Sequence, residues 1–456
     1  MKKTKLFEDF DPVSAKAWKQ KIQVDLKGAE YNKALLWESP EGINVKPFYH
    51  SDTDDFTIAV EAPEQWFIGE SIFIHELSGA LHAAKKALTH GAESIFFKSL
   101  TTFDTALFLK GLKAVAAPIY IHLDFLDPAF KKELINGALQ NNINLRLSVD
   151  IVGHLAREGN WFKDLTTDYT ALAKLQETNY RHIVSVDATL YANAGATLTQ
   201  QLAYALSHAN EYLNAHNNSE QKKEAFHITV NVSVGTNYFF EIAKLRALRR
   251  LFETVGEAYD FESTIDIVSK PLIRNKTIYD YNTNMLRTTT ECMSAVLGGS
   301  DVVVNEPYDV IYHKANAFGQ RIARNQLIIL KEESYFDAVC NPADGSYYIE
   351  QLTAQLAEKA LGIFKDLESS GGFVTNLIQG NIQRKIKESA QAEQTRFDNQ
   401  EITLLGSNKH PNPDDRMKDN LELYPFVKRR PRKTLLEPII PKRLAEKLEQ
   451  NRLEKE

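Results

Sequence analysis

Short apolar segments alternate with segments of helical periodicity through the middle of the chain, from Trp66 to about residue 335. Several of the apolar segments are hydrophobic at successive positions, which is typical of parallel strands that are covered on both faces. Eight of them occur, and eight strand–helix units fit one closed barrel. The pattern therefore predicts an α/β fold, a (β/α)8 TIM barrel. The predicted strands are residues 66–75, 94–99, 118–125, 144–153, 181–191, 226–235, 263–270 and 301–309.

Two of the intervening segments show helical faces clearly. After the fifth strand, apolar residues recur at spacings of three and four, and Thr197 and Gln200 stand where an N-cap and its capping-box partner would. After the sixth strand a second apolar stripe is formed by Tyr238, Ile242, Leu245, Leu248 and Phe252. Basic residues lie largely off this stripe and predict a solvated face. They are Lys244, Arg246, Arg249 and Arg250.

The composition changes outside the barrel. Residues 1–60 contain the turn Pro40-Glu41-Gly42, and they predict an arm that packs against another surface. Residues 61–335 form the predicted barrel, and residues 336–405 a helical extension of it. Residues 406–456 predict a polar linker and a short charged helix. Within them the basic string at 427–433 could attract an anionic partner, but a solvated linker is the favoured interpretation.

Charge and cysteine content narrow the class of protein. The chain has 456 residues and a formal net charge of -6, which argues against nucleic acid as a partner. The two cysteines, Cys292 and Cys340, are too few for a disulfide framework and form no C-x-x-C pair. The amino-terminal residues lack an apolar signal region, and no segment approaches the length of a membrane span. We therefore expect a soluble, cytoplasmic protein with no membrane partner.

Generic catalytic motifs are absent, so the candidate chemistry is positional. The chain has no phosphate-binding glycine loop, no H-E-x-x-H pair and no G-x-S-x-G elbow. Polar residues within or near the ends of predicted strands could build a metal-dependent hydrolase, or supply a Schiff-base lysine. The favoured interpretation is that they satisfy one another in a polar lumen. These residues are His122, Asp124, Asp150, Asp187, Asp266 and Lys270.

Longer strings resemble the methylmalonyl-CoA mutase family. LLWESPEGINVKPFY at residues 35–49 is similar to the family's amino-terminal signature, and NTNMLRTTTECMSAVLGG from Asn282 resembles one of its helices. Further similar strings begin at Tyr238, Arg321 and Asn341. The resemblance implies a barrel, an arm that contacts another subunit, and a radical isomerisation between methylmalonyl-CoA and succinyl-CoA that depends on adenosylcobalamin.

The departures from the catalytic members point to a supporting role. Aligned on Ala194-Gly195-Ala196, Thr189 takes the position of the family's tyrosine and Leu190 that of its histidine, which hydrogen-bonds the thioester carbonyl. Ser71 falls near the position of a second tyrosine. None of the 12 histidines has an aspartate two positions before it, so the family's cobalt-ligating motif is missing, and we expect no carboxy-terminal cobalamin-binding domain.

The resemblance thus implies a small, non-catalytic subunit whose large catalytic partner, in a heterodimer, carries adenosylcobalamin. We expect no catalytic, cofactor-binding or metal-binding residue on this chain, and no turnover by the isolated chain. Two alternatives stay open: an active acyl-CoA mutase barrel that uses a separate cobalamin-binding protein, and a metal-dependent barrel enzyme built on His122 and Asp124. The arm around Trp37 to Tyr49 is the candidate for subunit contact. Thr229, Asn231 and Ser233 share one strand parity and suit a polar lumen.

Overall fold

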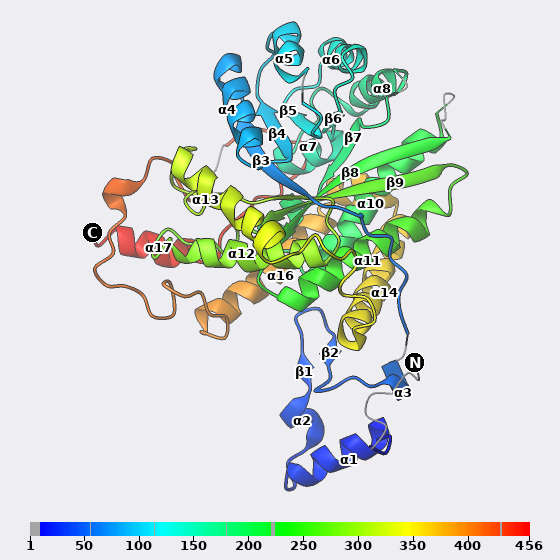
Figure 1. The fold of residues 1–456 in the computed structure, drawn as a ribbon, viewed down its shortest axis with the longest axis vertical. Coiled ribbons are helices and arrows are strands. Elements are labelled where there is room, and N and C mark those ends of the chain that lie inside the picture. The colour runs from blue at the N-terminus through cyan, green and yellow to red at the C-terminus, as the bar shows by residue number, and fades with distance from the viewer. Residues whose placement is uncertain (1–9, 55, 114, 179, 220–223, 429–430) are drawn as a thin grey trace, which may run out of the picture.

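A barrel of eight parallel strands forms the centre of the molecule (Figure 1). The computed structural model describes residues 10–54, 56–113, 115–178, 180–219, 224–428 and 431–456. Neighbours in the sheet follow the chain in order, and the last strand returns to pair with the first, Val302 facing Phe67. The strands are β3 (Phe67–Phe73), β4 (Ser94–Ser99), β5 (Ile119–Leu123), β6 (Leu145–Leu147), β7 (Val184–Asp187), β8 (Ala225–Val234), β9 (Glu262–Pro271) and β10 (Val302–Val304).

Backbone hydrogen bonds close the ring between β6 and β7. The amide of Leu147 donates to the carbonyl of His182 at 2.9 Å, and that of Val149 donates to Ile183 at 3.0 Å. The amide of Ser185 donates back to Val149 at 3.0 Å. The predicted (β/α)8 TIM barrel is therefore confirmed.

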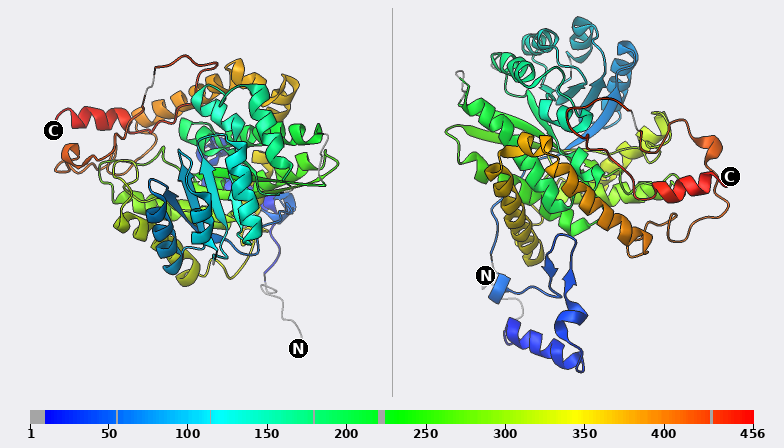
Figure 2. Two further views of the ribbon diagram at one scale, coloured as in Figure 1. Left: turned by 90° about the horizontal axis from the view of Figure 1, so that it is seen from above. Right: turned by 180° about the vertical axis from the view of Figure 1, so that it is seen from behind.

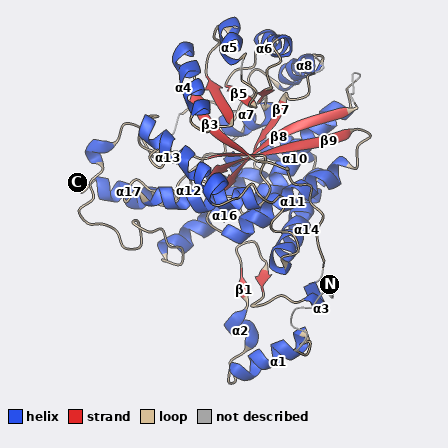
Figure 3. Cartoon of the chain, viewed as in Figure 1, coloured by secondary structure: helices blue, strands red, loops and turns tan. Residues whose placement is uncertain are grey.

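Helices surround the strands (Figure 3). They bury one face of the strands in the main hydrophobic core, which includes Ile95, Ile121 and Val230. The helices and turns of the barrel are α4 (Leu77–Thr89), α5 (Thr105–Leu112), α6 (Pro128–Gln140), α7 (Ile151–Glu158), α8 (Leu165–Gln176), α9 (Thr189–Ala194), α10 (Leu198–Asn217), α11 (Tyr238–Gly256), α12 (Thr283–Leu297), α13 (Ala317–Ile328) and the π-helical turn Ile329–Glu333. Among the described helices, none is long and apolar enough to cross a membrane.

All eight predicted strands exist, but three are less than half as long as the sequence pattern indicates. The prediction for residues 144–153 extends past β6 because Asp150 is an N-cap, accepting a hydrogen bond from the Gly153 amide, and the chain is helical from Ile151. The prediction for 181–191 likewise runs into α9, and that for 301–309 runs beyond Val304. Apolar residues continue across these strand ends, so hydrophobicity alone does not mark the change.

The helix after the fifth strand matches its prediction. In α10 the Thr197 side chain accepts a hydrogen bond from the Gln200 amide, and the Gln200 side chain accepts one from the Thr197 amide. This is the predicted capping box. The carboxylate of Glu41, from the amino-terminal arm, accepts hydrogen bonds from the two amides between them, those of Leu198 and Thr199, both at 2.9 Å. A residue of the family-like string Pro40-Glu41-Gly42 therefore caps a barrel helix within the same chain.

The charged face predicted on α11 is wrong for three of its four residues. Only the Arg250 side chain is substantially in contact with solvent, at 42% exposed. Lys244 is buried and pairs with Glu241, and Arg249 lies 2.6 Å from Asp301. Arg246 is 1% exposed and pairs with Asp344 and with Glu350. The reason is tertiary, because α14 packs along α11 and supplies Glu350 to a side that a lone helix would leave in water.

The amino-terminal arm projects from the barrel (Figures 1 and 2). Its hairpin meets the body where Trp37 contacts Phe240, with ring centroids 5.7 Å apart, and where Ile43 is fully buried. Beyond the hairpin, α1 buries none of its residues. The elements of the arm are α1 (Ala15–Asp25), α2 (Tyr31–Leu35), the antiparallel strands β1 (Trp37–Glu38) and β2 (Asn44–Val45), and α3 (Ser51–Asp54).

Helices and irregular segments follow the barrel. The predicted short charged helix exists as α17, but its Glu446 and Glu449 are buried, the latter paired with Arg443. In the predicted linker Arg432 pairs with Glu158 of α7, while residues 429–430 of the basic string lie outside the described residues. The elements are α14 (Tyr347–Ser369), α15 (Gly372–Ile378), α16 (Asn381–Asp398), a 3-10 turn (Lys418–Asn420) and α17 (Glu446–Leu453).

Candidate functional site

A cavity of about 790 Å³ lies at the carboxyl ends of the barrel strands. This is the end at which barrels of this type place their binding sites. Its walls mix apolar side chains with charged ones. The residues that define its character are Ser71, Ile72, Lys98, His122, Asp187, Leu190, Asn231, Lys270, Glu306 and Arg324.

The predicted pair His122 and Asp124 meets at this end of the barrel. His122 Nε2 lies 2.7 Å from Asp124 Oδ1, and Lys98 Nζ lies 3.0 Å from Asp124 Oδ2. Burial would raise the pKa of Asp124, but the hydrogen bond from His122 and the charge of Lys98 hold that pKa below its usual range. The carboxylate therefore has two partners of its own, and the pair is a satisfied ion-pair group.

Asp187 and Asp150 are also occupied. Asp187 lies 3.1 Å from Arg157 and accepts a hydrogen bond from Thr189. Asp150 accepts hydrogen bonds from Tyr212 at 2.7 Å and from the Asp187 amide at 2.8 Å. These contacts fix the turn between β7 and α9, on which the cavity wall depends.

A buried relay of side chains backs this turn. His208 Nε2 lies 2.8 Å from Asp150 Oδ1, and its Nδ1 lies 2.8 Å from the hydroxyl of Tyr191. Burial alone would raise the pKa of Asp150, but His208 and Tyr212 hold it well below its usual range. The expectation that the lumen carboxylates are satisfied by neighbouring groups is confirmed here.

Asp266 and Lys270 share a strand but not a site. Lys270 lines the cavity, with its Nζ 5.5 Å from the centre of the Phe96 ring. Burial raises the pKa of Glu306, which Lys270 opposes. Asp266 lies further back along β9, where it contacts Arg146 and His227 and does not line the cavity. The predicted candidates are therefore divided among separate groups.

The residues aligned with the family's reactive positions are non-ionic. Leu190 is 4% exposed and lines the cavity, where its aliphatic side chain offers no hydrogen-bond donor. The Thr189 hydroxyl donates a hydrogen bond to the Asp187 carboxylate. The Ser71 hydroxyl is buried and has no hydrogen-bond partner among the described residues.

The strand-parity residues of β8 also face inward as expected. Asn231 lines the cavity, and Ser233 accepts a hydrogen bond from Asn193 at 3.2 Å. Thr229 lies deeper and is 1% exposed.

An aromatic layer fills the lumen next to the cavity. The rings of Phe96 and Tyr120 stack with centroids 4.2 Å apart and 5° between their planes. They form a separate buried cluster with Val268, Val302 and Val304. A Cβ added at Gly69 would lie 2.6 Å from a methyl group of Val304, so even one more carbon would clash there. The axis of the barrel is therefore packed at this level.

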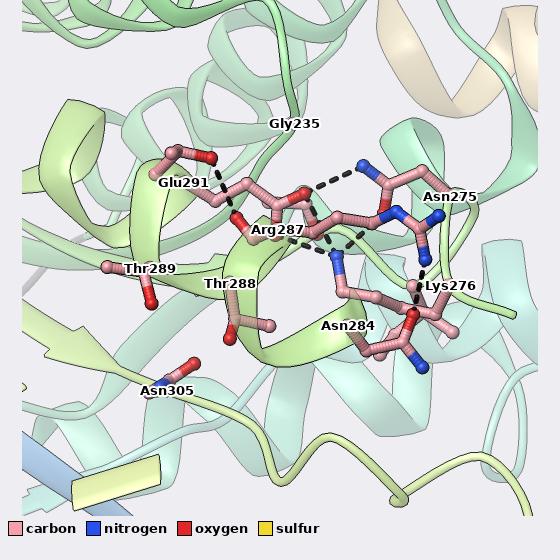
Figure 4. Close-up of polar contacts among 12 residues, drawn as sticks. Gly235, Asn275, Lys276, Asn284, Arg287, Thr288, Thr289, Glu291 and Asn305 are labelled. Carbon is pink, nitrogen blue, oxygen red and sulfur yellow. Dashed lines mark hydrogen bonds and ion pairs between the residues drawn. The ribbon is translucent and has the colours of Figure 1, made fainter. Parts of the chain in front are cut away.

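The family-like string from Asn282 builds a polar network away from the cavity (Figure 4). Lys276 Nζ lies 2.7 Å from Glu291, and Asn275 donates to the same carboxylate at 2.7 Å. Arg287 donates to Asn284 at 2.8 Å. These residues join the segment after β9 to α12, so their role is packing.

Sequence reasoning missed a cluster at the opposite, amino-terminal end of the barrel. His182 precedes β7, His227 lies on β8, and their rings are 4.4 Å apart. Burial lowers the pKa of His182 to about 4 and that of His227 to about 2. A signal existed, because the predicted strands 181–191 and 226–235 each carry a histidine at their second position.

The fold and the cavity define a (β/α)8-barrel protein whose lumen is packed along the barrel axis. Its cavity has both polar and apolar walls, and the carboxylates at this end are largely paired. The model of the methylmalonyl-CoA mutase family matches residues 129–453. The methylmalonyl-CoA mutase small subunit of Porphyromonas gingivalis is 33% identical over 90% of this chain and 72% of its own length. The chain belongs to the methylmalonyl-CoA mutase family.

Two further relatives carry names within this family. The methylmalonyl-CoA mutase small subunit of Streptomyces virginiae is 29% identical over 79% of this chain and 63% of its own length. The large subunit from Porphyromonas gingivalis is 29% identical over 53% of this chain and 34% of its own length. The matches therefore cover about two thirds of the length of these two small subunits, and about one third of the large subunit.

Proposed function

We propose that this chain is the small, non-catalytic subunit of a methylmalonyl-CoA mutase heterodimer. In this role a large subunit interconverts methylmalonyl-CoA and succinyl-CoA. The observation that carries the proposal is Leu190, an aliphatic side chain in the cavity wall at the position of the imidazole in the catalytic members that the sequence resembles. Loss of a positioned donor to a carbonyl oxygen costs on the order of a hundredfold or more in rate.

The packed lumen supports the same role. A thioester whose long pantetheine arm followed the barrel axis would have to pass the stacked rings of Phe96 and Tyr120. Both rings are nearly fully buried among valine side chains. Displacing them would open a void in a close-packed layer. An acyl-CoA threaded along this axis is therefore disfavoured.

We propose that adenosylcobalamin, whose reactive cobalt–carbon bond would supply the radical chemistry, is held by the large subunit. The histidines of this chain do not fit the family's cobalt-ligating motif, because none follows an aspartate by two positions. In the cavity, His122 is engaged by Asp124 and His313 lies 3.0 Å from Asp309. Both histidines that line the cavity are thus paired with a carboxylate.

The amino-terminal arm is the proposed contact with the large subunit. Trp18 and Val24 of α1 are 50% and 71% exposed, and Trp37 at the base of the arm is 45% exposed. Tryptophan is enriched among the residues that dominate binding energy at interfaces. An interface of the obligate class would cover such side chains. The arm therefore fits a partner surface better than it fits the chain's own barrel.

The proposal predicts that activity depends on the partner. The purified chain, the large subunit and their mixture are each assayed with adenosylcobalamin and methylmalonyl-CoA. We expect a one-to-one complex on gel filtration, cobalamin in the large subunit alone, and no succinyl-CoA from this chain by itself. Turnover by this chain with only a free cobalamin-binding protein would instead establish the open alternative of an active barrel.

A further inference from the structure

Three ligand-type side chains converge at the amino-terminal end of the barrel. They come from consecutive strands: His182 precedes β7, His227 lies on β8 and Asp266 lies on β9. Their ligand atoms all lie within 4.8 Å of one another. None of the three lines the cavity at the other end. The cluster is thus independent of the site described above and of the proposed subunit role.

Two ring nitrogens of this cluster lack hydrogen bonds. His182 Nδ1 and His227 Nε2 are buried, and neither has a hydrogen-bond partner among the described residues. Asp266 Oδ2 beside them is in contact with the guanidinium of Arg146. The His227 side chain is 5% exposed. Buried polar atoms are nearly always hydrogen-bonded or bound to an ion, so two such imidazole nitrogens beside a carboxylate indicate a missing ligand.

The orientation of His227 favours an ion over a direct hydrogen bond. Its Nδ1 lies 2.9 Å from Thr264 Oγ1, and with the proton on Nδ1 it leaves a lone pair on Nε2. Nε2 lies 3.1 Å from Asp266 Oδ2, but the pair is not aligned as a hydrogen bond. The lone pair therefore points beside the carboxylate oxygen, as it must when two ligands bind an ion that lies off the line between them.

We infer that His182, His227 and Asp266 form a binding site for one divalent transition-metal ion, with Zn²⁺ as the best fit. Two imidazole nitrogens and a carboxylate oxygen are ligands that zinc favours. With metal–ligand bonds of about 2.1 Å, tetrahedral ligand atoms stand roughly 3.4 Å apart. The distance of 3.1 Å between His227 Nε2 and Asp266 Oδ2 is close to that value, and the ligand atoms of all three residues lie within 4.8 Å of one another.

The position of the site indicates a structural role. It ties together three strands beside the junction where β6 and β7 close the ring through few backbone contacts. The amino-terminal face of such barrels serves stability rather than catalysis. The ion would therefore act as a clamp on barrel closure.

Arg146 competes with the ion for the carboxylate of Asp266. Its guanidinium contacts Asp266, and it also lies 5.5 Å from the centre of the Tyr120 ring. Metal binding must release the arginine from the carboxylate, since two cations cannot share that oxygen favourably. Removing the charge at this position is therefore expected to strengthen metal binding.

Metal binding by purified full-length protein tests this inference without any activity assay. Zn²⁺ is titrated calorimetrically, metal content is measured after dialysis, and Co²⁺ absorption reports tetrahedral coordination. We expect one ion per chain in the wild type, loss of that ion in His227→Asn, and weakening of roughly 10- to 100-fold in Thr264→Val. Arg146→Gln should bind more tightly than the wild type.

Matched variants decide the result. His122→Asn removes a histidine–aspartate pair at the cavity end and should leave the stoichiometry unchanged. Circular dichroism verifies that each variant is folded, and the Thr264 and Arg146 variants keep the test decisive if His227→Asn does not fold. The inference is overturned if neither the wild type nor Arg146→Gln binds an ion, or if loss occurs in His122→Asn instead.

Discussion

At the scale of single residues, His154 shows how burial changes a titrating group. Its ring stacks on Phe162 with centroids 3.5 Å apart. Burial lowers its pKa to about 4, and the nearby charge of Arg157 adds to the shift. The folded protein therefore keeps this imidazole neutral at a pH where an unfolded chain would protonate it.

This shift predicts a loss of stability in mild acid. The folded pKa of about 4 lies below the unfolded value of about 6.5, so the unfolded state takes up the proton first as the pH falls. The contribution of His154 is intact above about pH 6.5 and is lost progressively toward pH 4. His154→Phe should reduce the slope of unfolding free energy against pH in this window, measured by urea denaturation.

The exposed His75 provides the control for this experiment. His75→Gln should leave the pH dependence as it is in the wild type. An unchanged slope in His154→Phe would contradict the assignment. Phenylalanine preserves the stacking on Phe162, so a change in slope reports the titration and not a loss of packing.

At the scale of elements, α11 separates what a sequence pattern can and cannot predict. Its apolar stripe is confirmed, since Ile242, Leu245 and Leu248 are buried as their spacing indicates. The spacing predicts that the basic residues beside the stripe lie in solvent, but the structure buries Arg246. The spacing defines one face of a helix, but only the packing of α14 determines that the opposite face is also covered.

The buried arginine predicts unequal effects of two similar substitutions. Arg246→Met leaves the carboxylate of Glu350 buried without its main partner, and should lower the free energy of unfolding by about 3–5 kcal/mol. Arg250→Met on the exposed face should change it by less than about 0.5 kcal/mol. Urea unfolding of the two variants measures both values.

A double variant separates charge burial from packing. Arg246→Met combined with Glu350→Leu removes both charges and should regain part of the lost stability, because apolar replacement of a buried pair is often neutral. Equal stability of Arg246→Met and Arg250→Met would show that Arg246 is solvated in solution.

At the scale of the whole molecule, the arm and the barrel are joined by a small set of contacts. The hairpin is held where Glu41 caps α10 and where Trp37 meets Phe240. Farther out, α1 contributes no buried residue. The outer arm therefore adds little to the stability of the barrel, and its apolar side chains suit an external surface.

Truncation of the outer arm tests whether it serves binding to the partner and not stability of the barrel. Removing residues 1–35 should leave the thermal midpoint of the barrel nearly unchanged, because the hairpin anchored by Glu41 remains. Binding to the large subunit should weaken at least about tenfold, which corresponds to about 1.4 kcal/mol. An exposed tryptophan such as Trp18 can contribute at least this much to binding at an interface. Calorimetric titration measures the affinity. Full affinity of the truncated chain would move the subunit contact elsewhere.

Only part of the candidate site could be predicted from the sequence. The strand ends identified His122, Asp124 and Lys270 as residues of the carboxyl-terminal end, because parallel strands bring their ends to one edge. The same reasoning could not place Asp266 with His182, since no pattern specifies which polar groups on neighbouring strands face one another.

The sequence by itself determined the eight strand–helix units, the capping of α10 and the aliphatic side chain at position 190, because periodicity, cap chemistry and residue type are local properties. Tertiary structure alone decided that Arg246 is buried, that Phe96 and Tyr120 stack across the lumen, and that His182, His227 and Asp266 meet. These outcomes depend on contacts between residues far apart in the chain, whose energies arise only when the ring of strands closes.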